Sequence, residues 1–343
     1  MKERPLLVVL TPVLNEAWIL SAFLKATSLW ADYIIIADQM STDGSREIYS
    51  RFEELKSKGV KELKNDCKLI VVDNPRKEMH QSATRQLLFD AAKKIEGDKI
   101  FFAMDADEFL SGNFLETEGW KKIINSEPGD LFCFSWMNLN ASGTKYGLTE
   151  PYYWAAHVNE DILSGTYPER FIHEWRLPWP KHENHVYAVE DILFIHFGGV
   201  NEVRVKNKGL FYLVSQYTHP DNKRSAISLY RQYHDLQFKQ QYYDVPENAY
   251  EIYTKHGVDI WANIDLTAEG LHHVVTVQNK LNKLGSSALC KLDIWDEDFL
   301  HRYKVKDPRR PIDKLMHWYL RHTNKWARTY IVRAIDYVLK RVY

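Results

Sequence analysis

The sequence lacks the features that mark secreted, membrane-spanning and nucleic-acid-binding proteins. It has only three cysteines, Cys67, Cys133 and Cys290, whose spacing suits neither a metal site nor an obvious disulfide, so a reducing compartment is favoured. No segment approaches the roughly 20 apolar residues that span a bilayer. The net charge of -1 gives no general attraction to nucleic acid. We therefore expect a cytoplasmic protein, soluble or peripheral at the inner face of the membrane, with no nucleic-acid partner.

Glycine-rich phosphate-binding loops are also absent. No Gly-x-Gly-x-x-Gly follows the first predicted strand, and no Gly-Lys-Ser/Thr loop occurs anywhere in the chain. These absences argue against a dinucleotide-dependent dehydrogenase and against a P-loop nucleotidase. If the protein binds a phosphorylated ligand, a metal ion and basic side chains have to neutralise its charge.

What the sequence does contain is a regular alternation of strand and helix patterns over its first 110 residues. The run over 6–14 resembles the apolar part of a signal peptide, but it contains Pro12 and lacks a cleavage site, so a buried strand fits better. Strands separated by helices of this length form βαβ units and a parallel sheet covered on both faces. The predicted strands are 6–13, 33–37, 69–72 and 100–104, and the predicted helices are 16–29, 45–58 and 81–95.

Two carboxylates, Asp105 and Asp107, end the fourth predicted strand. On an extended strand, side chains at i and i+2 point to the same face, so both carboxylates are expected to converge. Like charges held that close repel unless a cation or a proton lies between them, and no basic residue lies nearby in the sequence. A divalent ion that keeps positions open for phosphate oxygens suits such a site. Taken alone, however, an Asp-x-Asp is also an ordinary polar strand end.

Polar residues follow the other three strands as well. Turn chemistry explains any one such cluster, but four clusters at the same edge of a sheet indicate one ligand site, because open α/β sheets bind ligands beyond the carboxyl ends of their strands. The residues are Thr11, Asn15 and Glu16 after the first strand, Asp38, Ser41 and Asp43 after the second, and Asn74, Pro75 and Arg76 after the third.

Three motifs in this half resemble the family 2 glycosyltransferases. They are Thr-Pro-Val-Leu-Asn-Glu at 11–16, Ile-Ile-Ile-Ala-Asp at 34–38 with Ser-Thr-Asp-Gly-Ser at 41–45, and Met-Asp-Ala-Asp-Glu-Phe at 104–109. The resemblance covers about the first 115 residues and is looser over 76–85 and 182–208. It implies an α/β fold of the GT-A type, with a mostly parallel sheet flanked by helices, a nucleotide-activated sugar donor, and inversion at the anomeric carbon.

The resemblance also implies a donor site. Asp107 would be a direct ligand of Mn²⁺ or Mg²⁺, Asp105 would contact the metal or the ribose, and His196 would contact the metal or the diphosphate. His196 could equally be a core residue, and Asp43 could belong to an ordinary tight turn. Arg85 could instead form a surface ion pair with Asp90. The residues expected to bind the nucleotide sugar are Thr11, Pro12, Asn15, Glu16, Asp38, Asp43, Arg76, Arg85, Asp105 and Lys206.

An inverting transferase needs a general base near the acceptor hydroxyl. Glu183 is our first choice, because the His182-Glu183 pair follows Pro178-Trp179-Pro180-Lys181 much as a His-Glu pair follows an acceptor-side loop in the resembled enzymes. Asp191 and Glu190 come next. A second His-Glu dipeptide, His173-Glu174, leaves the assignment open, and Glu169 and His182 are further candidates in the same region.

After about residue 130 the pattern changes. We predict a catalytic domain over 1–215, with a nucleotide-sugar half at 1–115 and an acceptor half at 116–215, and a mainly helical C-terminal region over 216–343. Further strands are predicted at 131–137 and 192–197, and helices near 225–243, 246–256 and 267–284.

The C-terminal tail is strongly basic. Residues 302–343 contain twelve Lys or Arg and three Asp, a net charge of +9. A helix over 312–341 would place much of its apolar set on one face with basic residues beside it. Such a face can lie on an anionic membrane, pack against the catalytic domain, or pair with a second copy in a homo-oligomer. The apolar set is Leu315, Trp318, Tyr319, Trp326, Tyr330, Ile331, Ile335, Val338 and Leu339.

The function predicted is the metal-assisted, inverting transfer of a hexose-type sugar from a nucleoside-diphosphate sugar to an acceptor hydroxyl. The acceptor would be a saccharide or a lipid-linked saccharide, as in cell envelope polysaccharide biosynthesis. Two alternatives remain at this point. A nucleotidyltransferase shares the sheet and the metal requirement but usually has a Gly-rich basic signature after its first strand, and a non-catalytic carbohydrate-binding protein would not need the intact Asp pair.

Overall fold

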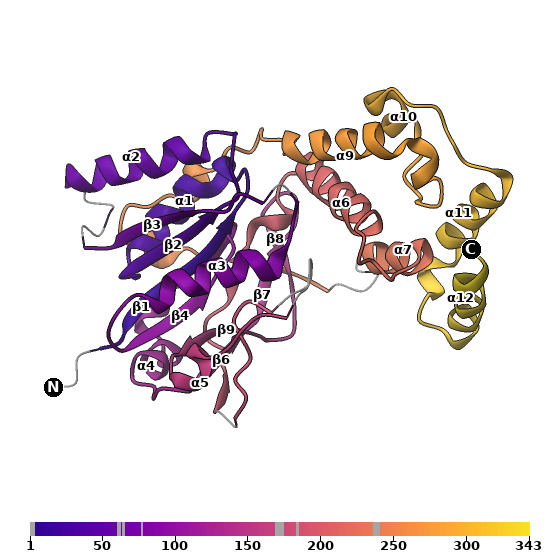
Figure 1. Cartoon of the computed structure of the whole chain (residues 1–343). Helices are drawn as coiled ribbons and strands as arrows, with labels where there is room; N and C mark the ends of the chain where they lie inside the picture. Colours follow the sequence, from indigo (N-terminus) through magenta and orange to yellow (C-terminus); the bar gives the residue numbers. More distant parts are fainter. Residues whose placement is uncertain are drawn as a thin grey trace. The chain divides into compact units, whose positions relative to one another are not determined.

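The computed structural model describes residues 4–59, 63, 66–76, 78–168, 175–182, 185–235 and 241–343. The chain divides into two compact units (Figure 1). The first comprises Met1–Val200 together with Tyr242–Thr267, and the second comprises Asn201–Gln241 and Ala268–Tyr343. The first unit contains the sheets, whereas the second is helical.

Four parallel strands form the centre of the first unit, in the order β3-β2-β1-β4. The inner strands β1, β2 and β4 are almost entirely buried, as expected when helices cover both faces of a parallel sheet. The predicted parallel sheet is therefore confirmed. The bounds are β1 Leu6–Val13, β2 Tyr33–Asp38, β3 Lys68–Asp73 and β4 Lys99–Ala103.

Helices cover this sheet from both sides. Helix α3, Gln81–Lys93, packs Leu88 and Phe89 against Leu10 and Phe101 in one buried cluster. Side chains alternate between the two faces of a strand, and Phe102 accordingly contacts Trp30 at the end of α1 instead, with ring centroids 5.0 Å apart. Helix α1 spans Ala17–Ser28, and helix α2, which packs beside it, spans Ser45–Ser57.

The sheet continues beyond β4 through an antiparallel strand. Strand β9, Tyr152–His157, pairs antiparallel with β4 and with β6, Leu131–Phe134, and β10, Val186–Ala188, completes seven strands. The predicted strand 131–137 is in fact two strands, because the chain leaves β6 and starts β7, Trp136–Leu139, in a second sheet. The order of that second sheet is β12 (Tyr242–Asp244), β8 (Lys145–Leu148), β7, β11 (Phe194–His196) and β5 (Glu108–Leu110).

The segment 242–267 returns to the first unit after an excursion of the chain into the second. The hydroxyl of Tyr253, which is fully buried, donates to the Leu110 carbonyl at 2.8 Å. The Asp265 N–H donates to the Trp18 carbonyl at 2.7 Å. The predicted helix near 246–256 is confined to α8, Glu251–Lys255. Residues 242 and 243, which end the predicted helix 225–243, instead belong to β12.

The second unit contains the longer helices of the C-terminal half. The predicted helix 225–243 extends only over α7 within the described residues, and the tail is two helices and not one. Helix α12 starts afresh because the Thr329 side chain caps it by accepting from the Val332 N–H. Among the described residues, no helix is long and apolar enough to cross a membrane. The bounds are α6 Glu202–Tyr217, α7 Ala226–Asp235, α9 Leu271–Leu284, α10 Glu297–Tyr303, α11 Pro311–Thr323 and α12 Tyr330–Val342.

Candidate active site

Asp105 and Asp107 lie in the turn that joins β4 to β5. The Glu108 N–H donates to the Asp105 carbonyl at 3.1 Å, which closes the turn, and the Asp107 carbonyl accepts from the Phe197 N–H at 2.8 Å. Since neither residue belongs to a strand, the expected sharing of one strand face is wrong. The two carboxylates consequently have different surroundings.

Asp105 is held between two arginines. Its Oδ1 lies 2.7 Å from Nη2 of Arg85, and its Oδ2 lies 2.8 Å from Nη2 of Arg176. Burial alone would raise the pKa of Asp105, but the charges of Arg176 and Arg85 outweigh burial and hold that pKa below its usual range. Although no basic residue lies near Asp105 in the sequence, the fold supplies two guanidinium groups as its counterions.

Arg176 is the main residue that sequence reasoning missed. Its guanidinium packs on the rings of both Trp136 and Trp154, 5.2 and 5.0 Å from their centroids. It donates to the Ala103 carbonyl at 3.1 Å and, through both terminal nitrogens, to Glu108 at 2.5 and 2.6 Å. Burial alone would lower the pKa of Arg176, but the surrounding carboxylates raise it. Arg176 therefore stays charged and fixes the turn in place.

Glu108 completes this buried network. Its side chain is fully buried and accepts from Trp136 Nε1 and from the Asp105 N–H, both at 2.8 Å, in addition to Arg176. A buried carboxylate is tolerated when its lone pairs are occupied by donors in this way. Glu108 is thus a structural anchor of the turn, next to the two aspartates that the sequence singled out.

Asp107 lies beside His196, at the end of β11. Its Oδ2 is 3.6 Å from Nε2 of His196, and Nδ1 of the same ring lies 2.7 Å from Oδ1 of Asn138. When Nδ1–H donates to Asn138, Nε2 presents a lone pair on the Asp107 side. A proton on the imidazole or a cation between the two atoms stabilises this arrangement. The structure thus brings together two of the three residues predicted to bind metal.

The donor set of Asp107 and His196 fits a divalent cation. Carboxylate oxygen and imidazole nitrogen are both ligands for metals such as Mn²⁺. Asp105 fits less well as a direct ligand, because two arginines engage its oxygens and would repel a cation. No cluster of three or more His, Cys, Asp or Glu that could hold a metal occurs within the described part of the chain. A metal here would therefore complete its coordination with ligand or water oxygens.

The loops after β1 and β2 are tied to each other by predicted site residues. Asn15 has a positive φ of 57°, its N–H donates to Oγ of Ser41 at 2.9 Å, and its Oδ1 accepts from the Thr42 N–H at 2.7 Å. Asp43 accepts from the Ala17 N–H at 2.9 Å, at the start of α1. The side chains of Asn15 and Asp43 therefore hold the loops after β1 and β2 together by hydrogen bonds.

The carboxylate of Asp38 also accepts hydrogen bonds from neighbouring residues of the protein. It is fully buried and accepts from the Ser41 N–H at 2.9 Å, from the Tyr49 hydroxyl at 2.9 Å and from Nη2 of Arg46 at 3.0 Å. Burial and the Asp38 charge raise the pKa of Tyr49, which keeps its hydroxyl protonated as a donor. Any contact of Asp38 with a nucleotide would have to replace or supplement these bonds.

The remaining donor-site candidates are dispersed. Thr11 is buried on the face of β1 opposite to Leu10 and α3, and its Oγ1 has no hydrogen-bond partner among the described residues. Glu16 accepts from Trp18 Nε1 at 2.6 Å. Pro12 lies opposite Ala37 in the sheet register, Arg76 is exposed, and Lys206 is exposed on α6 of the second unit. In contrast, the buried Nη1 of Arg85 is a donor without a partner in the described part of the structure.

The candidate bases separate into two groups. Glu183, Glu169, His173 and Glu174 lie outside the described residues. His182 is exposed, with its Nδ1 3.2 Å from Asp161, and Glu190 is exposed as well.

Asp191 lies away from the turn that contains Asp105 and Asp107. It accepts from the Gly119 N–H at 2.9 Å, in the first turn of α4, Glu118–Ile124. In the antiparallel β5–β11 pair, Glu108 lies opposite His196, and Leu110 lies opposite Phe194. Asp191 precedes Phe194, so it lies beyond the other end of this pair from Asp107.

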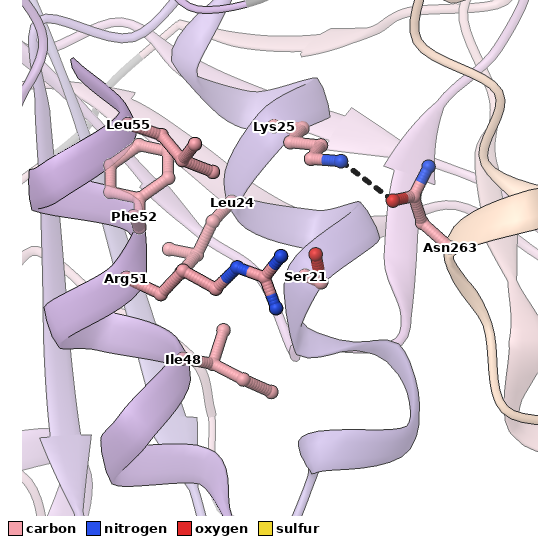
Figure 2. Close-up of a pocket in the computed structure, with 8 residues that line it drawn as sticks. All are labelled: Ser21, Leu24, Lys25, Ile48, Arg51, Phe52, Leu55 and Asn263. Atoms are coloured by element: carbon pink, nitrogen blue, oxygen red, sulfur yellow. Dashed lines mark hydrogen bonds between the residues drawn. The ribbon is translucent and has the colours of Figure 1, made fainter. Parts of the chain in front are cut away.

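A cavity of about 340 Å³ lies elsewhere in the first unit, between α1 and α2 (Figure 2). Lys25 points toward Asn263 and donates to its Oδ1 at 2.7 Å. None of the residues predicted from the sequence lines this cavity, so it is separate from the candidate site. Its lining residues are Ser21, Leu24, Lys25, Ile48, Arg51, Phe52, Leu55 and Asn263.

A mostly parallel sheet flanked by helices, with an Asp-x-Asp turn after β4, has the architecture of a glycosyltransferase of the GT-A type. The profile of glycosyl transferase family 2 matches residues 8–186, just over half of the chain, and the chain belongs to this family. The matched range includes Asp105, Asp107 and Arg176 and ends before His196. No curated protein matches the chain.

Several solved glycosyltransferases are distantly similar. A mannosyltransferase, PcManGT from Pyrobaculum calidifontis, solved with GDP-Man and Mn²⁺, is 11% identical over 96% of this chain and 89% of its own, with a TM-score of 0.37. Glucosyl-3-phosphoglycerate synthase from Mycobacterium tuberculosis is 20% identical over 39% of this chain and 44% of its own, with a TM-score of 0.26. GalNAc-T7, solved with UDP, GalNAc and Mn²⁺, is 11% identical over 83% of this chain and 59% of its own, with a TM-score of 0.33.

Proposed function

We propose that this glycosyltransferase transfers a sugar from a nucleoside-diphosphate sugar to an acceptor hydroxyl, with inversion and with the help of Mn²⁺ or Mg²⁺. The observation that carries the proposal is the approach of Asp107 to His196, 3.6 Å apart at the carboxyl edge of the sheet. That edge is where open α/β sheets bind ligands. A metal bound there would neutralise the charge that develops on the departing diphosphate.

Arg85 is proposed to contact the donor directly. Its Nη2 is held by Asp105, and its Nη1 is buried without a hydrogen-bond partner among the described residues. Buried donors are nearly always paired in complete structures, so a phosphate or ribose oxygen of the donor is a suitable partner. In this proposal Asp105 orients Arg85, and any contact of Asp105 with the nucleotide lies next to the contact that Arg85 makes. Thr11, Pro12, Asn15, Glu16, Asp38, Asp43, Arg76 and Lys206 stay proposed donor-site residues.

The acceptor is proposed to lie against the segment around Arg176. Trp175 and Trp179 flank Arg176 in the chain, are each about half exposed, and have ring centroids 5.0 Å apart. Exposed aromatic rings next to a polar site suit the apolar faces of a saccharide. Arg176 also forms an ion pair with Asp105. The proposed acceptor surface is therefore linked through Arg176 to the turn that contains Asp105 and Asp107.

Glu183 is proposed as the general base. In the sequence it follows Trp179, a residue of the proposed acceptor surface, by four positions. The base takes the proton of the acceptor hydroxyl while the acceptor oxygen bonds to the anomeric carbon. The bond from that carbon to the diphosphate breaks on the opposite face, which inverts the configuration and releases the nucleoside diphosphate.

The decisive experiment is incubation of the full chain with UDP-linked and GDP-linked hexoses and Mn²⁺, with detection of slow donor hydrolysis. Release of nucleoside diphosphate that a chelator stops, and that Asp107→Asn lacks, would support the proposal. Release of pyrophosphate would favour a nucleotidyltransferase. No turnover with any donor, together with sugar binding, would favour a non-catalytic carbohydrate-binding protein.

A further inference from the structure

One side of α12 is already filled by its own unit. Asp336 is buried and accepts from Nε of Arg231, on α7, at 2.9 Å. Leu339 and Tyr343 pack against a buried cluster that α7 and α11 provide. The inward face of α12 therefore needs no further partner.

A second face of α12 is apolar and uncovered. Ile331, Ile335, Val338 and Val342 follow one another at spacings of three and four residues, so they form one stripe along the helix. Their side chains are between 42% and 78% exposed. The stripe lies about a quarter to a third of a turn from the buried face, at 3.6 residues per turn. An apolar stripe of this extent on a soluble surface marks an interaction site.

The exposed charges of α12 are all of one sign. By the spacing of the helix, Arg341 lies about a quarter of a turn from the stripe, and Arg333 and Lys340 lie on the opposite, polar side of the helix. Arg333, Lys340 and Arg341 are exposed, and no carboxylate of the described residues lies within ion-pair distance of them. The only acidic residue of α12 is Asp336, which is buried against Arg231. The stripe is therefore accompanied by unbalanced positive charge.

Two exposed tyrosines complete this surface. Tyr330 is 87% exposed and Tyr337 is 59% exposed, on the side of the stripe away from the buried face. Tyrosine has an apolar ring and a polar tip, which suits the boundary between lipid headgroups and acyl chains. Apolar residues, cations and tyrosines are thus combined on one short helix.

We propose that α12 docks on an anionic membrane surface, with the stripe of Ile331, Ile335, Val338 and Val342 at the headgroup–acyl boundary. A helix that lies in the interface in this way gains from apolar burial and from attraction to anionic lipid. A second copy of the chain fits this face less well. Pairing two stripes would cover the apolar residues, but α12 would offer no exposed carboxylate to the cations of the other copy.

The test is flotation of the full chain with vesicles of pure phosphatidylcholine and of phosphatidylcholine with 30% phosphatidylglycerol. Binding is expected only to the anionic vesicles, and added salt is expected to weaken it, since salt screens exposed charges. The double variant Ile335→Ser/Val338→Ser is expected to lower binding at least tenfold. Both residues are exposed, so its thermal melting is expected to match that of the native chain.

A matched control is available on α9. Leu271 and Val275 are also more than half exposed, four residues apart, in the same unit. The variant Leu271→Ser/Val275→Ser is expected to bind anionic vesicles like the native chain. Absence of binding by the native chain at low salt would overturn the proposal, as would an equal loss in both variants. A dimer of the native chain that Ile335→Ser/Val338→Ser disperses would make the second copy the occupant.

Discussion

The two units of the chain differ in where their basic side chains lie. In the first unit, Arg85 and Arg176 point inward to balance Asp105 and Glu108 next to the candidate site. In the second unit, Arg231 forms an ion pair with Asp336, the one carboxylate side chain of α12. The basic residues of that helix, Arg333, Lys340 and Arg341, are exposed on the surface. The first arrangement balances the carboxylates next to the candidate site, whereas the second leaves positive charge exposed on α12.

The buried histidines of the two units differ in the same way. In the first unit, His157 is satisfied at both ring nitrogens, by Ser126 at 2.9 Å and by Asp98 at 2.7 Å. In the second unit, His273 is buried and neither ring nitrogen has a hydrogen-bond partner among the described residues. The ring nitrogens of His157 are therefore paired and those of His273 are not, and His273 is expected to make the second unit sensitive to acid.

The largest effect is expected when the site of the first unit loses Asp107. The variant Asp107→Asn keeps the shape of the side chain but removes its charge, so transfer is expected to fall on the order of 10³-fold. Release of nucleoside diphosphate from the donor measures the effect, and circular dichroism checks that the fold persists. Native activity of this variant in the presence of a chelator would contradict the role assigned to Asp107.

A comparable effect is expected from the base. Glu183→Gln is expected to retain donor binding and to lose transfer by about 10²- to 10⁴-fold, because the amide cannot accept the proton. Asp191→Asn is the matched control, since Asp191 accepts from the Gly119 N–H beyond the far end of the β5–β11 pair. A near-native Glu183→Gln together with an inactive Asp191→Asn would move the role to Asp191.

Removal of Arg176 tests how much its ion pairs with Asp105 and Glu108 contribute to stability. Arg176→Met leaves the buried Glu108 and the partly exposed Asp105 with one counterion fewer, and is expected to lower the free energy of unfolding by about 3–5 kcal/mol. Urea denaturation measures this loss. The double variant Arg176→Met/Glu108→Gln is expected to recover part of it. Lys58→Met, which breaks an exposed pair with Glu54, is the control and is expected to cost less than about 1 kcal/mol. Equal costs for Arg176→Met and Lys58→Met would show that the buried network contributes little.

The smallest effect is expected from acid, and it belongs to the second unit. Burial, with the nearby charges of His272, Arg204 and Lys208, lowers the pKa of His273 to about 2. The unfolded chain binds this proton near pH 6.5, whereas the folded chain does not. Stability from the neutral ring is therefore complete above pH 6.5 and falls as the pH drops below it, by at most about 1.4 kcal/mol per pH unit.

Thermal melts between pH 7 and pH 5 measure this dependence. The variant His273→Leu is expected to flatten the loss of stability below pH 6.5, because it removes the titrating ring. An unchanged pH dependence in His273→Leu would assign the acid sensitivity to other groups.

The sequence predicted the elements whose signals are local. The apolar runs of β1, β2 and β4 and the helices between them follow from periodicity, and the stop of α2 before Gly59 follows from its positive φ. The break in the tail was missed because one capping threonine, Thr329, outweighs a continuous apolar pattern. The split of 131–137 was missed because only pairing with distant strands decides which sheet each half joins.

Long-range partners explain what was missed at the site. The sequence singled out Asp105, Asp107 and His196 as candidates, because each follows an apolar run at the end of a predicted strand. It gave no sign of Arg176, which meets Asp105 across 71 positions of the chain. It also gave no sign that Asp38 and Asp43 would be occupied by neighbouring donors, because a turn residue and a ligand contact have the same sequence signature.

The path of the backbone constrains how this protein can be divided. The chain passes from one unit to the other near residues 200, 241 and 267, so no single cut yields two intact pieces. A chain that stopped at residue 200 would lose β12 and also Tyr253, whose hydroxyl holds the Leu110 carbonyl at the end of β5. Recombination at one junction would disrupt the sheet unit in the same way. A graft of the helical unit onto another transferase would therefore need three matched junctions, with residues 242–267 left with the sheets.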